Sequence, residues 1–184
     1  MYKKMKNIQE NLGSNTLLDH LDIIQFEQHT HLRASLKLIR STIDQAMQEG
    51  EPSLSLIKCR EIFLELNEEI EVHFKEEENV LFPLIRKLES DDVITSDDSE
   101  TLESMVQVLE YENNHTGDAL HQLKEACHKY SFCPNSFKHY NALMSRLQDF
   151  ERDLKAHAIN ETQYLYPTAI RKERILSFIP TSSY

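Results

Sequence analysis

Glycine and proline are scarce in this chain and tryptophan is absent: its 184 residues include only three glycines and five prolines. Because these two residues end helices and form turns, their scarcity leaves few places where the chain can reverse direction. Leucine, glutamate, lysine, glutamine and methionine, which favour helices, are plentiful instead. The composition therefore predicts one all-α domain of long helices joined by short connections.

The chain also lacks an apolar run long enough to cross a membrane, which requires roughly 18 residues. Its start, MYKKMKNIQENLGSN, is basic but has no apolar segment after it, which argues against a secretory signal. The three cysteines are odd in number, widely spaced and form no CxxC pair, which argues against a disulfide framework or a structural zinc site. The net charge of −11 argues against nucleic acid and anionic membranes as partners. We therefore expect a cytoplasmic protein.

Turn signals divide the chain into four segments. The breaks fall at residues 50–53, 89–99 and 133–136, which are rich in turn-forming or acidic residues. The predicted helical segments are residues 16–48, 53–88, 99–130 and 135–171. Helices of this length with short loops must run antiparallel to their neighbours, so we predict an up-down-up-down four-helix bundle. Residues 1–15 and 172–184 are left as terminal tails.

The apolar periodicity of the segments indicates which side chains point into the bundle. In the second segment, apolar residues recur every three or four positions, and His73 and Glu77 lie on that row. The predicted inward row of the fourth segment is Tyr140, Leu143, Leu147, Phe150, Leu154, His157, Glu161 and Tyr164. The predicted inward row of the first segment is Phe26, His29, Leu32, Leu36, Ile39 and Ile43. Ionisable side chains are thus expected inside the bundle.

One eleven-residue frame occurs twice, as HFKEEENVLFP at 73–83 and HAINETQYLYP at 157–167. Each copy has a histidine, a glutamate four residues later, and then leucine, an aromatic residue and proline. Residues i and i+4 share a helix face, so each helix offers one nitrogen and one oxygen to the same volume. Two such glutamates can bridge two cations while the histidines bind each cation from outside. Imidazole with carboxylate suits iron or manganese, with zinc as a further candidate.

A rival interpretation is that the two pairs are salt bridges or hydrogen-bonded pairs inside the bundle. A buried carboxylate is costly unless it is paired or metal-bound, so pairing alone is a sufficient physical reason for each pair. It does not explain why leucine, an aromatic residue and proline follow both pairs. Pro83 and Pro167 are predicted to bend their helices just past the ligands, although a helix end accounts equally well for Pro167.

Together with the HxxxR of His29 to Arg33, these motifs make residues 17–170 resemble the hemerythrin-like (HHE cation-binding) family. Within it, the chain is most similar to the branch that repairs iron–sulfur centres after nitrosative or oxidative stress. The resemblance implies a non-haem, carboxylate-bridged site holding two iron ions with four histidines and two glutamates. The implied terminal ligands are His29, His73 and His157, and the implied bridges are Glu77 and Glu161.

The fourth histidine is where this chain departs from the family pattern. Counting back four residues from Gly117 selects Asn113, whereas the nearest histidine is His115. Two residues on a regular helix differ by about 200°, so both cannot face the metals. We predict that a one-residue bulge near Asn113 rotates His115 inward as the ligand, since such bulges favour functional sites. The alternative is a three-histidine site with His115 at the surface.

Two further departures concern function. The branch commonly carries a cysteine pair in a small N-terminal domain, and the residues before the first predicted helix here contain no cysteine. The chain also has no HxxxH pair, which predicts open coordination and poor oxygen carriage.

The sequence thus predicts a di-iron protein of nitrosative or oxidative stress defence that supports repair of damaged iron–sulfur clusters or reacts with nitric oxide or peroxide. Sensors of oxygen, nitric oxide or iron, and iron carriers, remain alternatives, and whether the protein is an enzyme is left open. The expected partners are oxygen, nitric oxide or peroxide, with iron–sulfur proteins as further candidates. The predicted metal ligands are His29, His73, Glu77, His115, His157 and Glu161.

Overall fold

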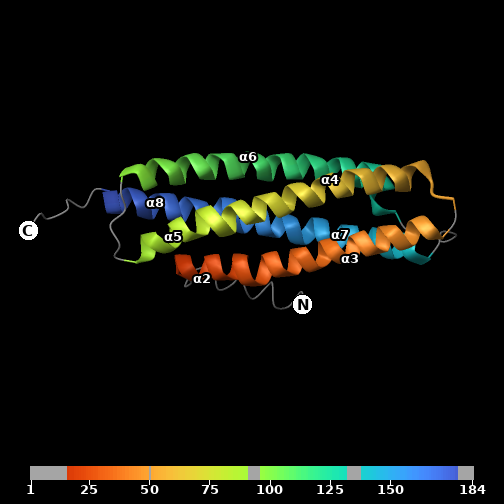
Figure 1. Cartoon of the computed structure of the whole chain (residues 1–184), viewed down its shortest axis with the longest axis horizontal. Coiled ribbons are helices and arrows are strands. Elements are labelled where there is room, and N and C mark those ends of the chain that lie inside the picture. The colour runs from red at the N-terminus through yellow and green to blue at the C-terminus, as the bar shows by residue number, and fades with distance from the viewer. Residues whose placement is uncertain (1–15, 50, 91–95, 132–137, 178–184) are drawn as a thin grey trace, which may run out of the picture.

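The computed structural model describes residues 16–49, 51–90, 96–131 and 138–177, and in these ranges the chain forms helices and no strand. The predicted tail at residues 1–15 lies outside the described residues, as do Gly50, the whole third turn signal at residues 133–136 and residues 178–184 of the predicted C-terminal tail. Four long rods lie side by side and alternate in direction along the chain (Figure 1). The prediction of an all-α, up-down-up-down four-helix bundle is confirmed.

Three of the rods are divided by a widened, π-helical turn. The first rod consists of α2 (Leu17–Asp22), η1 (Ile23–His29) and α3 (Thr30–Gln48). The second consists of α4 (Leu54–Glu76), η2 (Glu77–Leu81) and α5 (Phe82–Glu89). The third is α6 (Ser96–Ala126), followed by the 3₁₀ turn η3 (His128–Tyr130). The fourth consists of α7 (Lys138–Asn160), η4 (Glu161–Leu165) and α8 (Tyr166–Ser177), which continues beyond the helix end expected at residue 171.

Local signals account for the starts of α2 and α4. Thr16 and Asp19 form a capping box, in which the Thr16 hydroxyl accepts from the Asp19 backbone N–H and the Asp19 carboxylate accepts from the Thr16 backbone N–H. The Ser53 hydroxyl accepts a hydrogen bond from the Leu56 backbone N–H at the start of α4. These caps satisfy backbone donors that have no partner inside their own helices.

The π-helical turns in the second and fourth rods lie directly before the two prolines. The backbone N–H of Phe82 donates to the carbonyl of Glu77, and that of Tyr166 donates to the carbonyl of Glu161, five residues earlier in each case. Pro83 and Pro167 have no N–H, and their rings would clash with a carbonyl four residues earlier in a regular helix. A widened turn relieves that clash. Both turns begin at the glutamate of the repeated frame.

The widened turns also change which side chains point inward. Phe26 was predicted to be buried, but 63% of its surface is exposed, and Ile24 is buried in its place. The π-helical turn η1 adds a residue between Ile24 and His29, so the row predicted from regular spacing is wrong before His29. In the fourth rod, Leu165 and Tyr166 are fully buried whereas Tyr164 is only partly buried.

The bundle core is divided into two hydrophobic clusters by a layer of polar side chains. One cluster includes Leu32, Phe74, Leu120 and Leu154, and packs α3, α4, α6 and α7 together. The other fills the end formed by α2, α5, α8 and the first half of α6. In the second and fourth rods, the histidines and glutamates of the repeated frames lie at the boundary between the two clusters. The folded bundle therefore places a polar layer inside an apolar surround, where water is largely excluded.

Candidate metal centre

Four buried side chains from three rods converge in the polar layer: His29, Glu77, His157 and Glu161. Each contributes one atom to a group in which every pair of atoms lies within 4.8 Å. His157 Nε2 is 2.7 Å from Glu161 Oε1, and His29 Nε2 is 3.2 Å from Glu77 Oε2. The two repeated frames are thus brought together, with His29 between them.

His73 faces the same volume from the second rod. Its Nε2 lies 3.7 Å from Glu77 Oε2 and 4.0 Å from Glu161 Oε2. The two oxygens of Glu161 therefore face different imidazoles, Oε1 towards His157 and Oε2 towards His73. A carboxylate in this position can contact two cations at once.

The inward-facing atoms of this layer have no hydrogen-bond partner among the described residues. They are Nε2 of His29, His73 and His157, Oε2 of Glu77 and Oε1 of Glu161. Some lie close to one another, but not with the angles that a hydrogen bond requires. Buried polar atoms are nearly always paired, so five unpaired atoms aimed at one volume are the donor set expected of a metal centre. Imidazole nitrogens with carboxylate oxygens fit iron.

The opposite nitrogen of each histidine is held by an oxygen from another side chain. His29 Nδ1 is 2.7 Å from Glu78 Oε1, and His73 Nδ1 is 2.8 Å from Glu112 Oε2. The longest of the three contacts, 3.2 Å, joins His157 Nδ1 to Gln28 Oε1. Holding Nδ1 in this way fixes the ring orientation, leaves Nε2 free to bind a metal and raises the basicity of the ligand.

Arg33, the last residue of the HxxxR motif, supports His29 indirectly. Its guanidinium donates two hydrogen bonds to Glu78, at 2.7 and 3.1 Å, and one to Glu71 at 3.2 Å. It also lies 5.3 Å from the ring centre of Phe74, which stacks on the His29 imidazole. The Arg33 guanidinium and the His29 imidazole outweigh partial burial and lower the pKa of Glu78. Glu78 therefore remains an anion that accepts from His29.

The two glutamates of the layer titrate differently. Burial, followed by the nearby Glu161 carboxylate, raises the pKa of Glu77. Burial also acts to raise the pKa of Glu161, but His157 and His73 outweigh it and lower that pKa well below its usual range. Burial acts to lower the pKa of His73, but Glu161, Glu77 and Glu112 outweigh it and raise that pKa to about 10. A proton on His73 compensates the carboxylates here, and cations would compensate them in the same way.

Tyr166 completes the surroundings of Glu77. Its hydroxyl donates a 2.7 Å hydrogen bond to Glu77 Oε1, and both side chains are fully buried. This bond leaves Oε2 of the same carboxylate facing His29 and His73. Tyr166 is the aromatic residue of the second repeated frame. The frame was recognised from the sequence, but the role of this hydroxyl was not.

The structure does not bring His115 into the cluster. α6 is a regular α-helix through residues 111–120, so the expected bulge near Asn113 is absent. The His115 side chain is 57% exposed, and its Nδ1 lies 3.4 Å from Glu69. Asn113 faces the site instead, with its side-chain nitrogen 3.1 Å from Glu161 Oε2. The position counted back from Gly117 is therefore the one that faces inward.

Three outer supporting residues, Gln28, Glu78 and Glu112, were not among the residues expected at the site. Gln28 directly precedes His29 in the sequence, and Glu78 directly follows Glu77. Their position next to predicted ligands was therefore a weak signal that they belong to the site. Glu112 had none, because its contact with His73 depends on how two helices pack.

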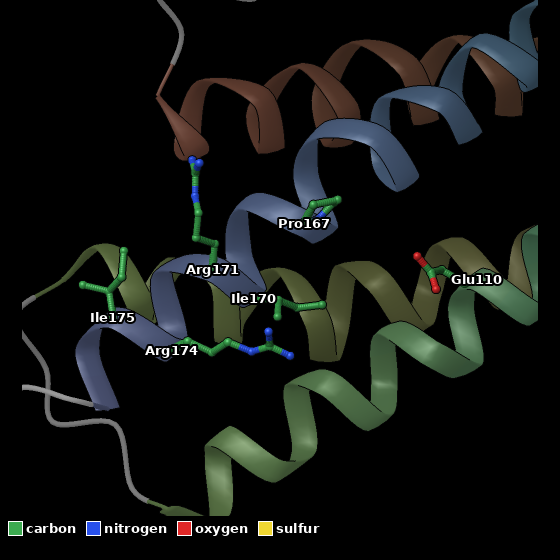
Figure 2. Close-up of a pocket in the computed structure, with 6 residues that line it drawn as sticks. All are labelled: Glu110, Pro167, Ile170, Arg171, Arg174 and Ile175. Atoms are coloured by element: carbon green, nitrogen blue, oxygen red, sulfur yellow. The ribbon is translucent and has the colours of Figure 1, made fainter.

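A separate surface pocket of about 450 Å³ lies between α8 and α6 (Figure 2). Its lining residues are Glu110, Pro167, Ile170, Arg171, Arg174 and Ile175. Figure 2 shows Arg174 extending towards α6, where it pairs with Glu103 at 3.2 Å. None of the metal-binding candidates lines this pocket, so it is distinct from the buried centre.

The fold and the buried cluster together define a class of protein: a four-helix bundle with a histidine–carboxylate cluster in its core that could hold metal. The sequence comparison identifies the family. The hemerythrin HHE cation binding domain matches residues 21–169, and the chain belongs to this family. The predicted family resemblance is thereby confirmed.

Distant relatives point in the same direction. The iron-sulfur cluster repair proteins YtfE of Escherichia coli O1:K1 and Escherichia fergusonii are each 21% identical to this chain over 157 residues. The matched region covers 85% of this chain and 66% of each relative. In the part of the chain that the structure describes, no helix is both long and apolar enough to cross a membrane.

Proposed function

We propose that this protein is a non-haem di-iron protein of nitrosative and oxidative stress defence. It would support repair of damaged iron–sulfur clusters or react with nitric oxide or peroxide. The observation that carries the proposal is the set of five buried, unpaired donor atoms on His29, His73, Glu77, His157 and Glu161. Membership of the family and the printed name of the distant relatives support it.

His29, His73 and His157 would be terminal ligands, and Glu77 and Glu161 would be shared between the two ions. Bound iron would supply one-electron chemistry and open positions for small diatomic ligands or peroxide. The protein residues would bind the ions and keep the centre dry. Phe74 and Phe82 stack against the His29 ring and are almost fully buried, so water has little access from that side.

One observation favours the second candidate function, an iron carrier. The third rod contributes Asn113, an amide, where the other rods contribute imidazole. A centre with fewer strong ligands releases metal more readily than a saturated one. A protein that donates iron would need such a centre, whereas an oxygen carrier would need a stable one.

Anaerobic loading with iron(II), followed by elemental analysis and Mössbauer spectroscopy, tests the metal centre. With iron(II) in excess we expect about two iron ions per chain, as for other carboxylate-bridged centres built in bundles. Failure to bind iron, manganese or zinc would refute the metal assignment. Turnover of nitric oxide or peroxide by the loaded protein would favour an enzyme, and reversible binding without turnover would favour a sensor.

Glu161→Ala tests whether the Glu161 carboxylate is shared between the two ions. We expect it to abolish magnetic coupling between the ions and to lower iron content, while circular dichroism shows that helix content is kept. Glu65→Ala is the same change at an exposed position of α4 and should leave both properties unchanged. If the Glu161 variant retains the wild-type Mössbauer spectrum, Glu161 does not bridge.

A further inference from the structure

We propose that the two metal positions of this centre are unequal, so that the protein binds one divalent first-row metal ion tightly and exchanges the other. The inference rests on the proposed metal-binding function. It concerns the donor set that this particular chain offers, rather than the occupancy expected of its family.

The tight position is defined by the four side chains whose ligand atoms lie within 4.8 Å of one another: His29, Glu77, His157 and Glu161. They supply two imidazole nitrogens and two carboxylate oxygens, which is enough to surround an ion with protein ligands. All four side chains are at most 1% exposed. Both imidazoles are held from behind at Nδ1, by Glu78 and Gln28.

The weak position is the volume that His73 faces. His73 Nε2 is the single imidazole there, and its nearest carboxylate oxygens are Glu77 Oε2 at 3.7 Å and Glu161 Oε2 at 4.0 Å. Glu77 Oε2 also faces the tight position, because it lies 3.2 Å from His29 Nε2. The other oxygen of Glu77 accepts from Tyr166. An ion beside His73 therefore has one imidazole of its own and shares both glutamate side chains with the tight position.

The third rod does not compensate for this deficit. Glu112 is engaged with His73 Nδ1 at 2.8 Å, on the side of the ring away from the centre. Asn113 points towards the centre and contacts Glu161 Oε2 at 3.1 Å through its amide nitrogen. A neutral amide is a weaker ligand for iron than imidazole, and an amide that donates to Glu161 competes with an ion for the same oxygen. His115 is turned towards Glu69 and cannot contribute.

A large difference in affinity follows from this ligand count. Even the loss of an outer partner of a ligand commonly costs about 10- to 100-fold in metal affinity. The absence of a direct ligand should cost at least as much. We therefore expect the two dissociation constants to differ by at least about tenfold. The ion beside His73 would also keep positions open to exogenous ligands.

The test is an anaerobic titration of the metal-free full chain with Fe²⁺ against a competing chelator, with bound iron measured by elemental analysis. The wild type should take up two ions with separated affinities and retain about one after desalting. Asn113→His adds the missing imidazole and should narrow the ratio of the two dissociation constants by about tenfold or more, because the weak position then gains a direct ligand. His121→Ala, an exposed position of α6, is the control and should match the wild type.

Two more variants keep the proposal testable if Asn113→His fails to fold. His73→Ala should keep the tight ion and lose the weak one, and His115→Ala should bind like the wild type. Equal affinities in the wild type, loss of the tight ion in His73→Ala, or loss of an ion in His115→Ala would each overturn the inference while leaving metal binding intact. Absence of any bound ion in the wild type would instead refute the proposed function.

Discussion

Tyr166→Phe tests whether the hydrogen bond to Glu77 stabilises the bundle. The change removes a single oxygen and leaves the ring in place. The hydroxyl donates to Glu77 Oε1 at 2.7 Å between two fully buried side chains, so no water can replace it. A buried acceptor left without its donor typically costs about 1–3 kcal/mol. We expect a loss of about 2 kcal/mol, which is roughly 4–8 °C in Tm for a domain of this size.

The measurement is thermal and urea unfolding of chelator-treated protein, followed by far-ultraviolet circular dichroism. Metal must be absent because a bound ion would add its own stabilisation to both proteins. Tyr164→Phe is the matched control: the side chain is two residues away and partly buried, and its ring contacts His20. We expect that control to change stability by less than about 0.5 kcal/mol. Equal Tm values for the two variants would refute the reasoning, because the hydroxyl–carboxylate bond would then contribute nothing.

Three other predictions concern the support of the centre and the rest of the fold. Arg33→Gln should weaken metal binding by about 10- to 100-fold in a chelator competition assay, because the carboxylate behind His29 loses its guanidinium. Burial acts to raise the pKa of Glu151, but hydrogen bonds from two lysines outweigh it and lower that pKa. Glu151→Gln should therefore cost about 0.5–1 kcal/mol at neutral pH, and urea unfolding should show that difference shrink as pH falls below the ordinary pKa of a glutamate and vanish once the folded wild-type side chain is protonated as well. Leu147→Ala should destabilise the bundle by about 2–5 kcal/mol in the same assay, since Leu147 is fully buried, and a loss below about 1 kcal/mol would mean that the core closes around the gap.

Some features of the protein follow from local chemistry and could be read along the chain. Scarce glycine and proline, apolar spacing of three and four, and acidic or proline-containing breaks are sufficient to predict four antiparallel helices. The pairing of His73 with Glu77, and of His157 with Glu161, is also local. Residues four apart share a helix face in any regular helix, so the structure needed only to turn that face inward.

Other features depend on contacts between segments that are far apart in the sequence. Whether Asn113 or His115 faces the centre depends on the rotation of α6 against its neighbours, and the helix stays regular where a bulge was predicted. The burial of Ile24 in place of Phe26 depends on a π-helical turn, and helical periodicity cannot anticipate a turn of that kind.

The sequence by itself determined the helices and the ligand pairs, because helical spacing and residue chemistry are properties of short stretches of chain. Only the tertiary structure decided which oxygens hold the three imidazoles. Glu112 reaches His73 across 39 positions of the chain, and Gln28 reaches His157 across 129. No spacing rule connects such residues, because their contacts are made only when the four helices pack around a shared core.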